Sequence, residues 1–82
     1  MEKLRVLVVD DESLIRMDIT EMLEDAGYDV VAEGENGAQA IELARKHSPD
    51  VIVMDVKMPV MDGISASKVI ADEDIAPVIL LT

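Results

Sequence analysis

Three aspartates stand directly after two apolar runs, and they are the residues of this sequence best placed to do chemistry. Asp10 and Asp11 follow the run at 6–9, and Asp55 follows the run at 51–54. Both runs are short, rich in β-branched residues and not alternating, which is typical of strands buried inside a parallel sheet. Because an unpaired carboxylate is costly to bury, we expect the aspartates where these strands reach water. If the two strands are neighbours, the three carboxylates converge on one spot.

Three carboxylates at one strand end are typical of a site for a hard cation. Without a cation they repel one another. Mg²⁺ relieves this repulsion, because it prefers oxygen ligands and binds one or two carboxylates together with waters and phosphate oxygens. Asp55 could act as a nucleophile in covalent phosphoryl transfer, while the cation offsets the charge of the transferring oxygens. The alternative is that each acid only caps a helix or keeps a strand end hydrated.

Strands and helices are predicted to alternate along the chain. We expect strands at 4–9, 28–32, 51–54 and 78–81, and helices at 13–26, from the turn at 34–37 to about 47, and at 64–71. Ser13 is expected to cap the first helix and Gly27 to end it, and Ser48-Pro49 is expected to end the second. The apolar face of the first helix comprises Ile15, Ile19, Met22, Leu23 and Ala26, and that of the second comprises Ala40, Ile41 and Ala44.

This alternation predicts an α/β fold with a doubly wound parallel sheet and helices on both faces, because crossover connections are right-handed. We place the first strand between the second and the third, which gives the strand order 2-1-3-4. In such sheets, sites lie at the carboxyl ends of strands, where successive connections leave in opposite directions. That point falls between the first and third strands, so the fold and the aspartates indicate the same site.

Composition and charge limit the class of partner. The chain has 82 residues, a formal net charge of −11 and no cysteine. It is expected to be one domain, and direct binding to nucleic acid is not expected, because contact with a phosphate backbone requires Lys and Arg. Disulfides and zinc sites built on cysteine are excluded. No apolar stretch is long enough to span a membrane and no signal peptide precedes the first strand, so we expect a cytoplasmic protein without membrane partners.

Three segments together resemble the receiver domain of two-component response regulators. They are VLVVDDES at 6–13, VIVMDVKMPVMDG at 51–63 and APVILLT at 76–82. The resemblance implies a flavodoxin-like fold, Mg²⁺ as the cofactor and a sensor histidine kinase as the partner. It also implies that Met58 and Pro59 shape the pocket and that Gly63 opens the third helix.

The same resemblance assigns roles to single residues. It implies that Asp55 is the phosphoacceptor and that Asp11 is a direct Mg²⁺ ligand, with Asp10 assisting through water. Asp55 itself and the backbone carbonyl of Lys57 complete the metal site. Thr82 corresponds to the switch hydroxyl that hydrogen-bonds the phosphoryl group.

A narrower resemblance is to antiterminator regulators of the ANTAR type, carried by SLIRMDITEML, MDVKMP, DGI and IAP. Those proteins carry an RNA-binding module after the receiver, and because none is present here, RNA binding is not expected of this chain. A receiver also continues through a fourth helix, a fifth strand with a phosphate-pairing lysine, and a fifth helix. We therefore expect residues 1–82 to form a receiver domain incomplete at its C-terminus, with metal binding retained and phosphoryl transfer impaired.

Two other functions remain open at this point. A Mg²⁺-dependent phosphohydrolase would use an aspartyl nucleophile on the first strand, but Asp10-Asp11-Glu12 is a poor match to its usual Asp-x-Asp, and we expect no enzyme. The other is an interaction fragment. Residues 78–81 are apolar on both faces, as in an interior strand, and no later strand is available to pair with them. Such an edge predicts self-association by strand pairing or by exchange of elements.

Overall fold

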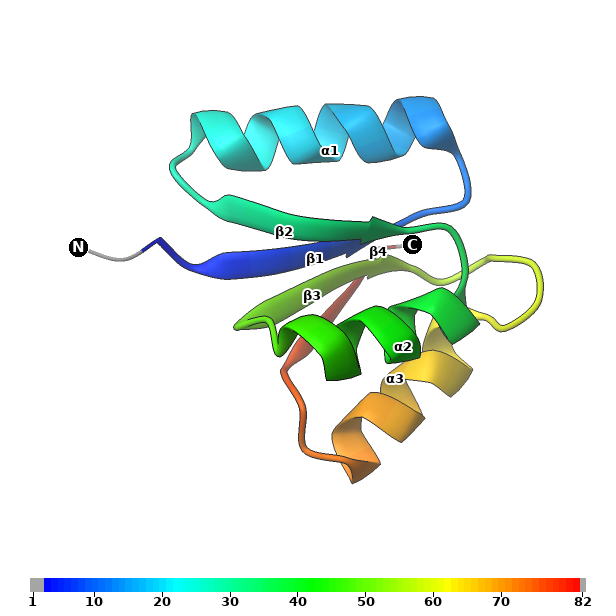
Figure 1. Ribbon diagram of the computed structural model, residues 1–82. Coiled ribbons are helices and arrows are strands. Elements are labelled where there is room, and N and C mark those ends of the chain that lie inside the picture. Colours follow the sequence, from blue (N-terminus) through cyan, green and yellow to red (C-terminus); the bar gives the residue numbers. More distant parts are fainter. Residues whose placement is uncertain (1–2, 82) are drawn as a thin grey trace.

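Strands and helices alternate along the chain, as the sequence predicts. The computed structural model describes residues 3–81 (Figure 1). The strands are β1 (Arg5–Val9), β2 (Asp29–Gly34), β3 (Val51–Asp55) and β4 (Val78–Leu81), and the helices are α1 (Ser13–Asp25), α2 (Gly37–His47) and α3 (Gly63–Asp72). The largest difference from the predicted bounds is in β2, which continues to Gly34 rather than ending at Ala32. None of the helices in this described part is long and apolar enough to cross a membrane.

The four strands form one parallel sheet in the order β2-β1-β3-β4, which confirms the predicted topology. Helix α1 lies on one face of the sheet, and α2 and α3 lie on the other (Figure 1). The register pairs Val9 of β1 with Met54 of β3. The residues that follow these two therefore leave the sheet side by side.

The core lies between the sheet and the α2–α3 layer. Strand β1 is buried from Val6 to Val9, because it has a strand on either side and helices above and below. The predicted apolar face of α2 is confirmed, since Ala40, Ile41 and Ala44 are all buried. The buried cluster comprises Leu7, Val9, Ala40, Ile41, Ala44, Ile52, Met54, Ala66 and Ile70.

Helix α1 is less buried than its sequence pattern predicts. Ile19 and Leu23 are half-buried, but Ile15 and Met22 are 42% and 64% exposed, and no residue of the helix is fully buried. The physical reason is that α1 is the only described helix on its face of the sheet, so one side of its apolar stripe has no neighbour (Figure 1). Of the five residues predicted on the apolar face of the first helix, Ile15, Met22 and Ala26 are therefore exposed, and Ile19 and Leu23 alone pack partly against the sheet.

The two ends of α1 differ in how well they were predicted. Ser13 is not the cap: Glu12 occupies that position, and it makes no side-chain capping hydrogen bond. At the other end, the stop at Gly27 is confirmed. Gly27 has a φ of 97°, its N–H donates to the carbonyl of Glu24 at 3.0 Å, and the N–H of Tyr28 donates to Leu23 at 3.0 Å. These two bonds are those of a helix end at which glycine adopts a positive φ.

The α1 side of the sheet is open beside the helix. A groove of about 330 Å³ is lined by Leu4, Val6, Leu23, Tyr28, Val51, Val53 and Ile79. Leu4, Tyr28 and Val51 lie at or before the first residues of their strands, so this apolar groove extends toward the end of the sheet opposite the aspartates.

Candidate metal centre

The three aspartates meet at the carboxyl ends of β1 and β3. Asp10, Asp11 and Asp55 each offer a carboxylate oxygen, and these oxygens lie within 4.8 Å of one another. Asp10 is buried, Asp55 is half-buried and Asp11 is exposed, so the cluster opens toward solvent on the Asp11 side. The predicted convergence of these carboxylates is confirmed.

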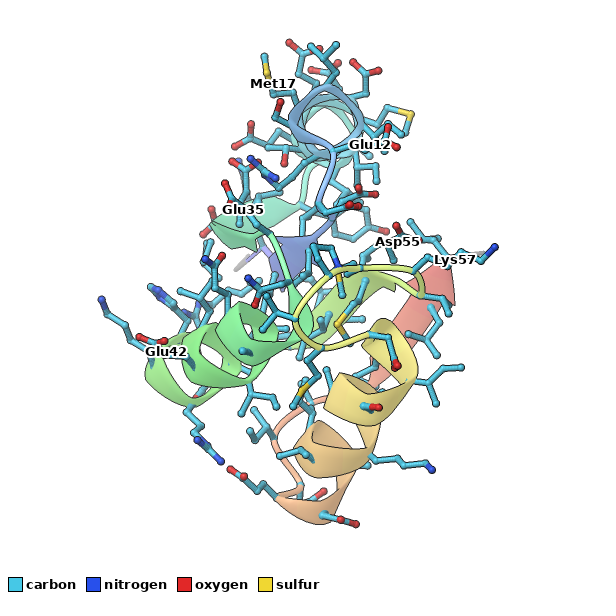
Figure 2. The ribbon with its side chains drawn as sticks, turned by 90° about the vertical axis from the view of Figure 1, so that its right-hand side faces the viewer. Glu12, Met17, Glu35, Glu42, Asp55 and Lys57 are labelled. Atoms are coloured by element: carbon cyan, nitrogen blue, oxygen red, sulfur yellow. The ribbon has the colours of Figure 1, made fainter. Side chains whose placement is uncertain are left out.

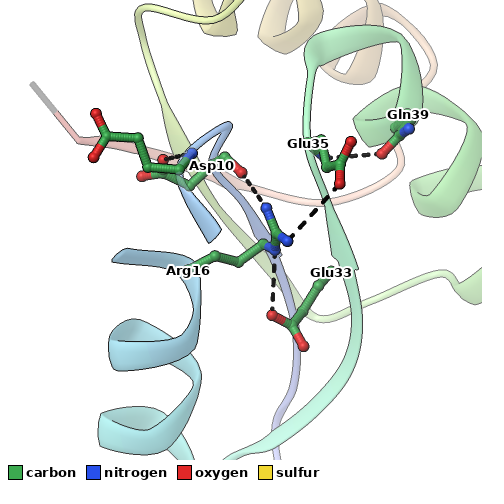
Figure 3. Close-up of polar contacts among 6 residues, drawn as sticks. Asp10, Arg16, Glu33, Glu35 and Gln39 are labelled. Carbon is green, nitrogen blue, oxygen red and sulfur yellow. Dashed lines mark hydrogen bonds and ion pairs between the residues drawn. The ribbon is translucent and has the colours of Figure 1, made fainter. Parts of the chain in front are cut away.

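Asp10 is held by three hydrogen bonds, and Figure 3 shows the one from Arg16. Its N–H donates to the carbonyl of Gly34 at 3.1 Å, which extends the pairing of β1 with β2 by one residue. Its side-chain Oδ1 accepts from the N–H of Glu12 at 2.9 Å. Its carbonyl oxygen accepts from Nη1 of Arg16 at 2.7 Å. The Oδ1 bond also explains why α1 begins after Glu12, since the turn into the helix is closed by Asp10 and not by Ser13.

Asp55 is positioned by the start of α3. The N–H of Gly63 donates to the carbonyl of Val56 at 2.8 Å, and a Cβ built on Gly63 would overlap the carbonyl oxygen of Asp55. Only glycine allows so close an approach of the helix to the strand end. The predicted role of Gly63 in opening α3 is confirmed, and Asp62 caps the helix by accepting from the N–H of Ser65 at 2.7 Å.

The segment 56–62 is fixed at a second point by α2. The N–H of Gly37 donates to the carbonyl of Met61 at 2.9 Å, and a Cβ on Gly37 would overlap that same carbonyl. Met58, in the same segment, is half-buried and packs against the core. The loop beside Asp55 is therefore hydrogen-bonded to the first residues of both α2 and α3.

The remaining predicted site residues lie at the margin of the cluster. Lys57 is exposed two residues beyond the end of β3, and Figure 2 shows its side chain pointing outward, away from Asp55. The amino group of Lys57 is therefore not directed at the carboxylates. The ligand role predicted for this residue belongs to its backbone carbonyl. Thr82 lies outside the described residues.

The charges around the cluster fit a divalent cation. Within residues 3–81, no Lys or Arg forms an ion pair with Asp10, Asp11 or Asp55; the ion pairs that do form use Arg16 and Arg45. The three carboxylates thus present oxygen ligands that no described Lys or Arg neutralises by an ion pair, and oxygen ligands are those that Mg²⁺ prefers.

Arg16 is the residue near the site that the sequence did not indicate. Its side chain is 15% exposed, and it lies 3.4 Å from Oε1 of Glu33 and 4.0 Å from Oε1 of Glu35. A basic residue in the first turns of a mostly apolar and acidic helix is the signal that could have directed attention to it. Its contact with Asp10 is to a backbone atom, which no side-chain pattern encodes.

The sequence and structure are similar to those of several known proteins. Residues 6–82 match the family described as the response regulator receiver domain. The chain is 54% identical over 78 residues to the transcriptional regulatory protein PdtaR of Mycobacterium tuberculosis, which covers 95% of this chain and 38% of PdtaR. The chain therefore spans less than half the length of that relative.

Two solved structures are similar as well. The signal receiver domain of the response regulator NarL from Mycobacterium tuberculosis has a TM-score of 0.94 and 38% identity, over 98% of this chain and 66% of that one. A chain of the CheX–CheY–BeF3–Mg complex from Borrelia burgdorferi has a TM-score of 0.86 and 28% identity, over 94% of this chain and 60% of that one.

Proposed function

Because the chain belongs to the response regulator receiver domain family, we propose that it accepts a phosphoryl group on Asp55 from a phosphohistidine of a sensor histidine kinase. The observation that supports this most strongly is the meeting of the oxygens of Asp10, Asp11 and Asp55 within 4.8 Å at the carboxyl ends of β1 and β3. The narrower likeness to antiterminator regulators and the cytoplasmic location predicted from the sequence belong to the same proposal.

The metal ligands we propose are Asp10, Asp11, Asp55 and the backbone carbonyl of Lys57. When bound, Mg²⁺ would offset the negative charge of the phosphoryl oxygens next to these carboxylates. A CheY structure with BeF3 and Mg is among the similar structures, and we extend the cation from that protein to this chain. Asp10, which is buried and fixed by hydrogen bonds, would orient the site, and Asp11, which is exposed, would meet the incoming cation.

In the proposed transfer, a carboxylate oxygen of Asp55 attacks the phosphorus of the donor phosphohistidine. A P–O bond forms, the P–N bond breaks, and the ring nitrogen keeps the electron pair and takes a proton from solvent. Asp55 is half-buried and therefore partly accessible to a donor. The transfer requires the attacking oxygen and the leaving group to lie roughly in line with the phosphorus. The added charge would then bias a conformational equilibrium, with the hydroxyl of Thr82 hydrogen-bonded to the phosphoryl group.

Labelling with a small phosphodonor tests this proposal. The chain is incubated with acetyl phosphate and Mg²⁺, and the intact mass is compared with that of Asp55→Asn. We expect the unmodified chain to gain one phosphoryl group and Asp55→Asn to gain none. Asp18→Asn, a matched change at an exposed residue of α1, should be labelled like the unmodified chain. Equal labelling of Asp55→Asn would show that Asp55 is not the acceptor.

A second assay, with a generic phosphate ester as substrate, separates a receiver from a phosphohydrolase. A receiver is expected to stop at one phosphoryl group per chain, because the acyl phosphate is its product. A phosphohydrolase would release inorganic phosphate from a generic phosphate ester over many turnovers. Continuous release that depends on Asp10 would favour the enzyme.

A second candidate function is self-association through β4. Ile79 and Leu81 are 53% and 37% exposed on this strand, and Ile79 also lines the apolar groove. The backbone carbonyls of Pro77 and Leu81 accept from the N–H groups of Ile52 in β3 and of Val56 just after it. The alternate residues 78 and 80 therefore direct their backbone groups to the outer edge. Among the described strands, β4 pairs with β3 alone. An apolar strand with an unpaired edge favours pairing with another copy of the chain.

A further inference from the structure

Arg16 links the helix α1 to the turn that carries the aspartates. Its Nη1 donates to the carbonyl oxygen of Asp10 at 2.7 Å, while Nε and Nη2 face Glu33 at 3.4 Å and Glu35 at 4.0 Å (Figure 3). The side chain is only 15% exposed. The Arg16 guanidinium thus connects α1, which carries it, to the end of β1 and the end of β2.

The contact of Arg16 is with the backbone of Asp10 and not with a carboxylate of the cluster. The other bonds to Asp10 come from its own strand pairing with Gly34 and from the turn at Glu12. Among the described residues, Arg16 is therefore the side chain that fixes the Asp10 carbonyl from outside the turn. A charged donor at this distance is stronger than a neutral one.

Charge and position predict opposite effects if Arg16 is removed. A cation close to three carboxylates competes electrostatically with Mg²⁺, so by charge alone its loss would strengthen metal binding. Glu33 and Glu35 lie against the guanidinium and offset much of its charge. The loss of the bond to Asp10, in contrast, frees the turn and separates the carboxylates, which weakens metal binding.

We propose that Arg16 is a positioning residue for the metal centre, holding the turn at Asp10 and Asp11 in the geometry in which their carboxylates meet Asp55. This inference rests on the cation-binding part of the proposed function. Mutation of groups that orient metal ligands lowers metal affinity by about 10–100-fold. We expect the dissociation constant for Mg²⁺ to rise by about tenfold in Arg16→Met, at the lower end of that range because the contact is to a backbone atom.

The test is a calorimetric titration with Mg²⁺ of the unmodified chain, Arg16→Met and Arg16→Lys. Lysine keeps the charge but cannot span Asp10 and both glutamates, so it should also weaken binding, and it keeps the test possible if Arg16→Met does not fold. Arg45→Met and Arg45→Lys are the matched controls, because Arg45 pairs with Glu73 on the surface of α2, away from the site. These controls should bind Mg²⁺ like the unmodified chain.

A second measurement needs no metal. The amide of Glu12 donates to Oδ1 of Asp10, so hydrogen exchange at this amide reports whether the turn is held. We expect faster exchange in both Arg16 variants and no change in the Arg45 variants. Equal or tighter Mg²⁺ binding in Arg16→Met, or unchanged exchange at Glu12, would overturn the positioning role while leaving the proposed function intact. An unmodified chain that binds no Mg²⁺ would overturn both.

Discussion

Asp62 caps α3 with its carboxylate, and this single contact makes the stability of the chain depend on pH. The N–H of Ser65 donates to the carboxylate and thereby lowers the pKa of Asp62 below its ordinary value of 3.8. A group whose pKa is lowered by folding stabilises the folded state above its unfolded pKa, and that contribution is lost as the pH falls through the folded pKa. Asparagine can cap the helix but does not titrate. We expect the advantage of the unmodified chain over Asp62→Asn in unfolding free energy to be present at neutral pH and to shrink below pH 3.8.

Urea unfolding at a series of pH values measures this difference. Asp18→Asn is the control, because Asp18 is exposed and its carboxylate caps no helix. The difference in unfolding free energy between Asp18→Asn and the unmodified chain should not shrink below pH 3.8 in the way expected for Asp62→Asn. If the unfolding free energies of Asp62→Asn and the unmodified chain change with pH in parallel, the Asp62 carboxylate does not titrate as its capping bond implies.

The sequence was sufficient for the acidic cluster but not for what holds it. Asp10 and Asp55 each follow an apolar run, and parallel strands end at the same edge of a sheet, so their meeting could be predicted. The role of Arg16 could not, because its partner is a backbone carbonyl whose direction depends on where α1 begins. The misplaced cap at Ser13 has the same origin, since Asp10 had already closed that turn.

At the scale of elements, the contact between α3 and β3 connects the stability of the fold to the site. A Cβ on Gly63 would overlap the carbonyl of Asp55, so the helix start or the strand end must move in Gly63→Ala. Inserting an atom into a well-packed contact costs about 1–3 kcal/mol of unfolding free energy. We expect Gly63→Ala to lose stability by this amount in urea unfolding, and to bind Mg²⁺ more weakly because Asp55 is displaced.

Gly34→Ala is the matched control for this change. A Cβ at Gly34 would lie 3.3 Å from Cδ1 of Leu43, the end of a side chain that can rotate away. It should therefore cost less stability than Gly63→Ala, although Gly34 also lies beside Asp10. If both variants lose the same stability, the approach of α3 to Asp55 is not the constraint that the structure indicates.

The elements themselves could be predicted from hydrophobic pattern and turn residues, whereas which apolar residues of α1 stay exposed could not. Ala40 and Ala44 of α2 are buried because α3 and the sheet enclose them. Ile15 and Met22 of α1 follow an equally regular pattern but remain exposed. A sequence pattern identifies the apolar side of a helix, and the neighbours available to cover that side are a property of the assembled layers.

At the scale of the whole molecule, the two faces of the sheet are covered unequally. Helices α2 and α3 lie on one face and α1 lies on the other (Figure 1). The apolar groove lies on the α1 face, where Leu23 of that helix lines it. The chain also carries a net charge of −11, which opposes the approach of a second copy. Hydrophobic association through this face should therefore strengthen as salt screens the repulsion.

Sedimentation at several salt concentrations tests whether β4 and the groove join two copies of the chain. Ile79 is 53% exposed and lines the groove, so Ile79→Lys places a charge where an apolar contact would form. We expect the unmodified chain to associate more strongly as salt rises, and Ile79→Lys to remain a monomer at the same concentrations.

Val60→Lys is the matched control, because Val60 is 83% exposed in the loop before α3 and does not line the groove. It adds the same charge and should associate like the unmodified chain. If both variants lose association equally, net charge and not the β4 surface controls it, and a monomeric unmodified chain at high salt would exclude this interface.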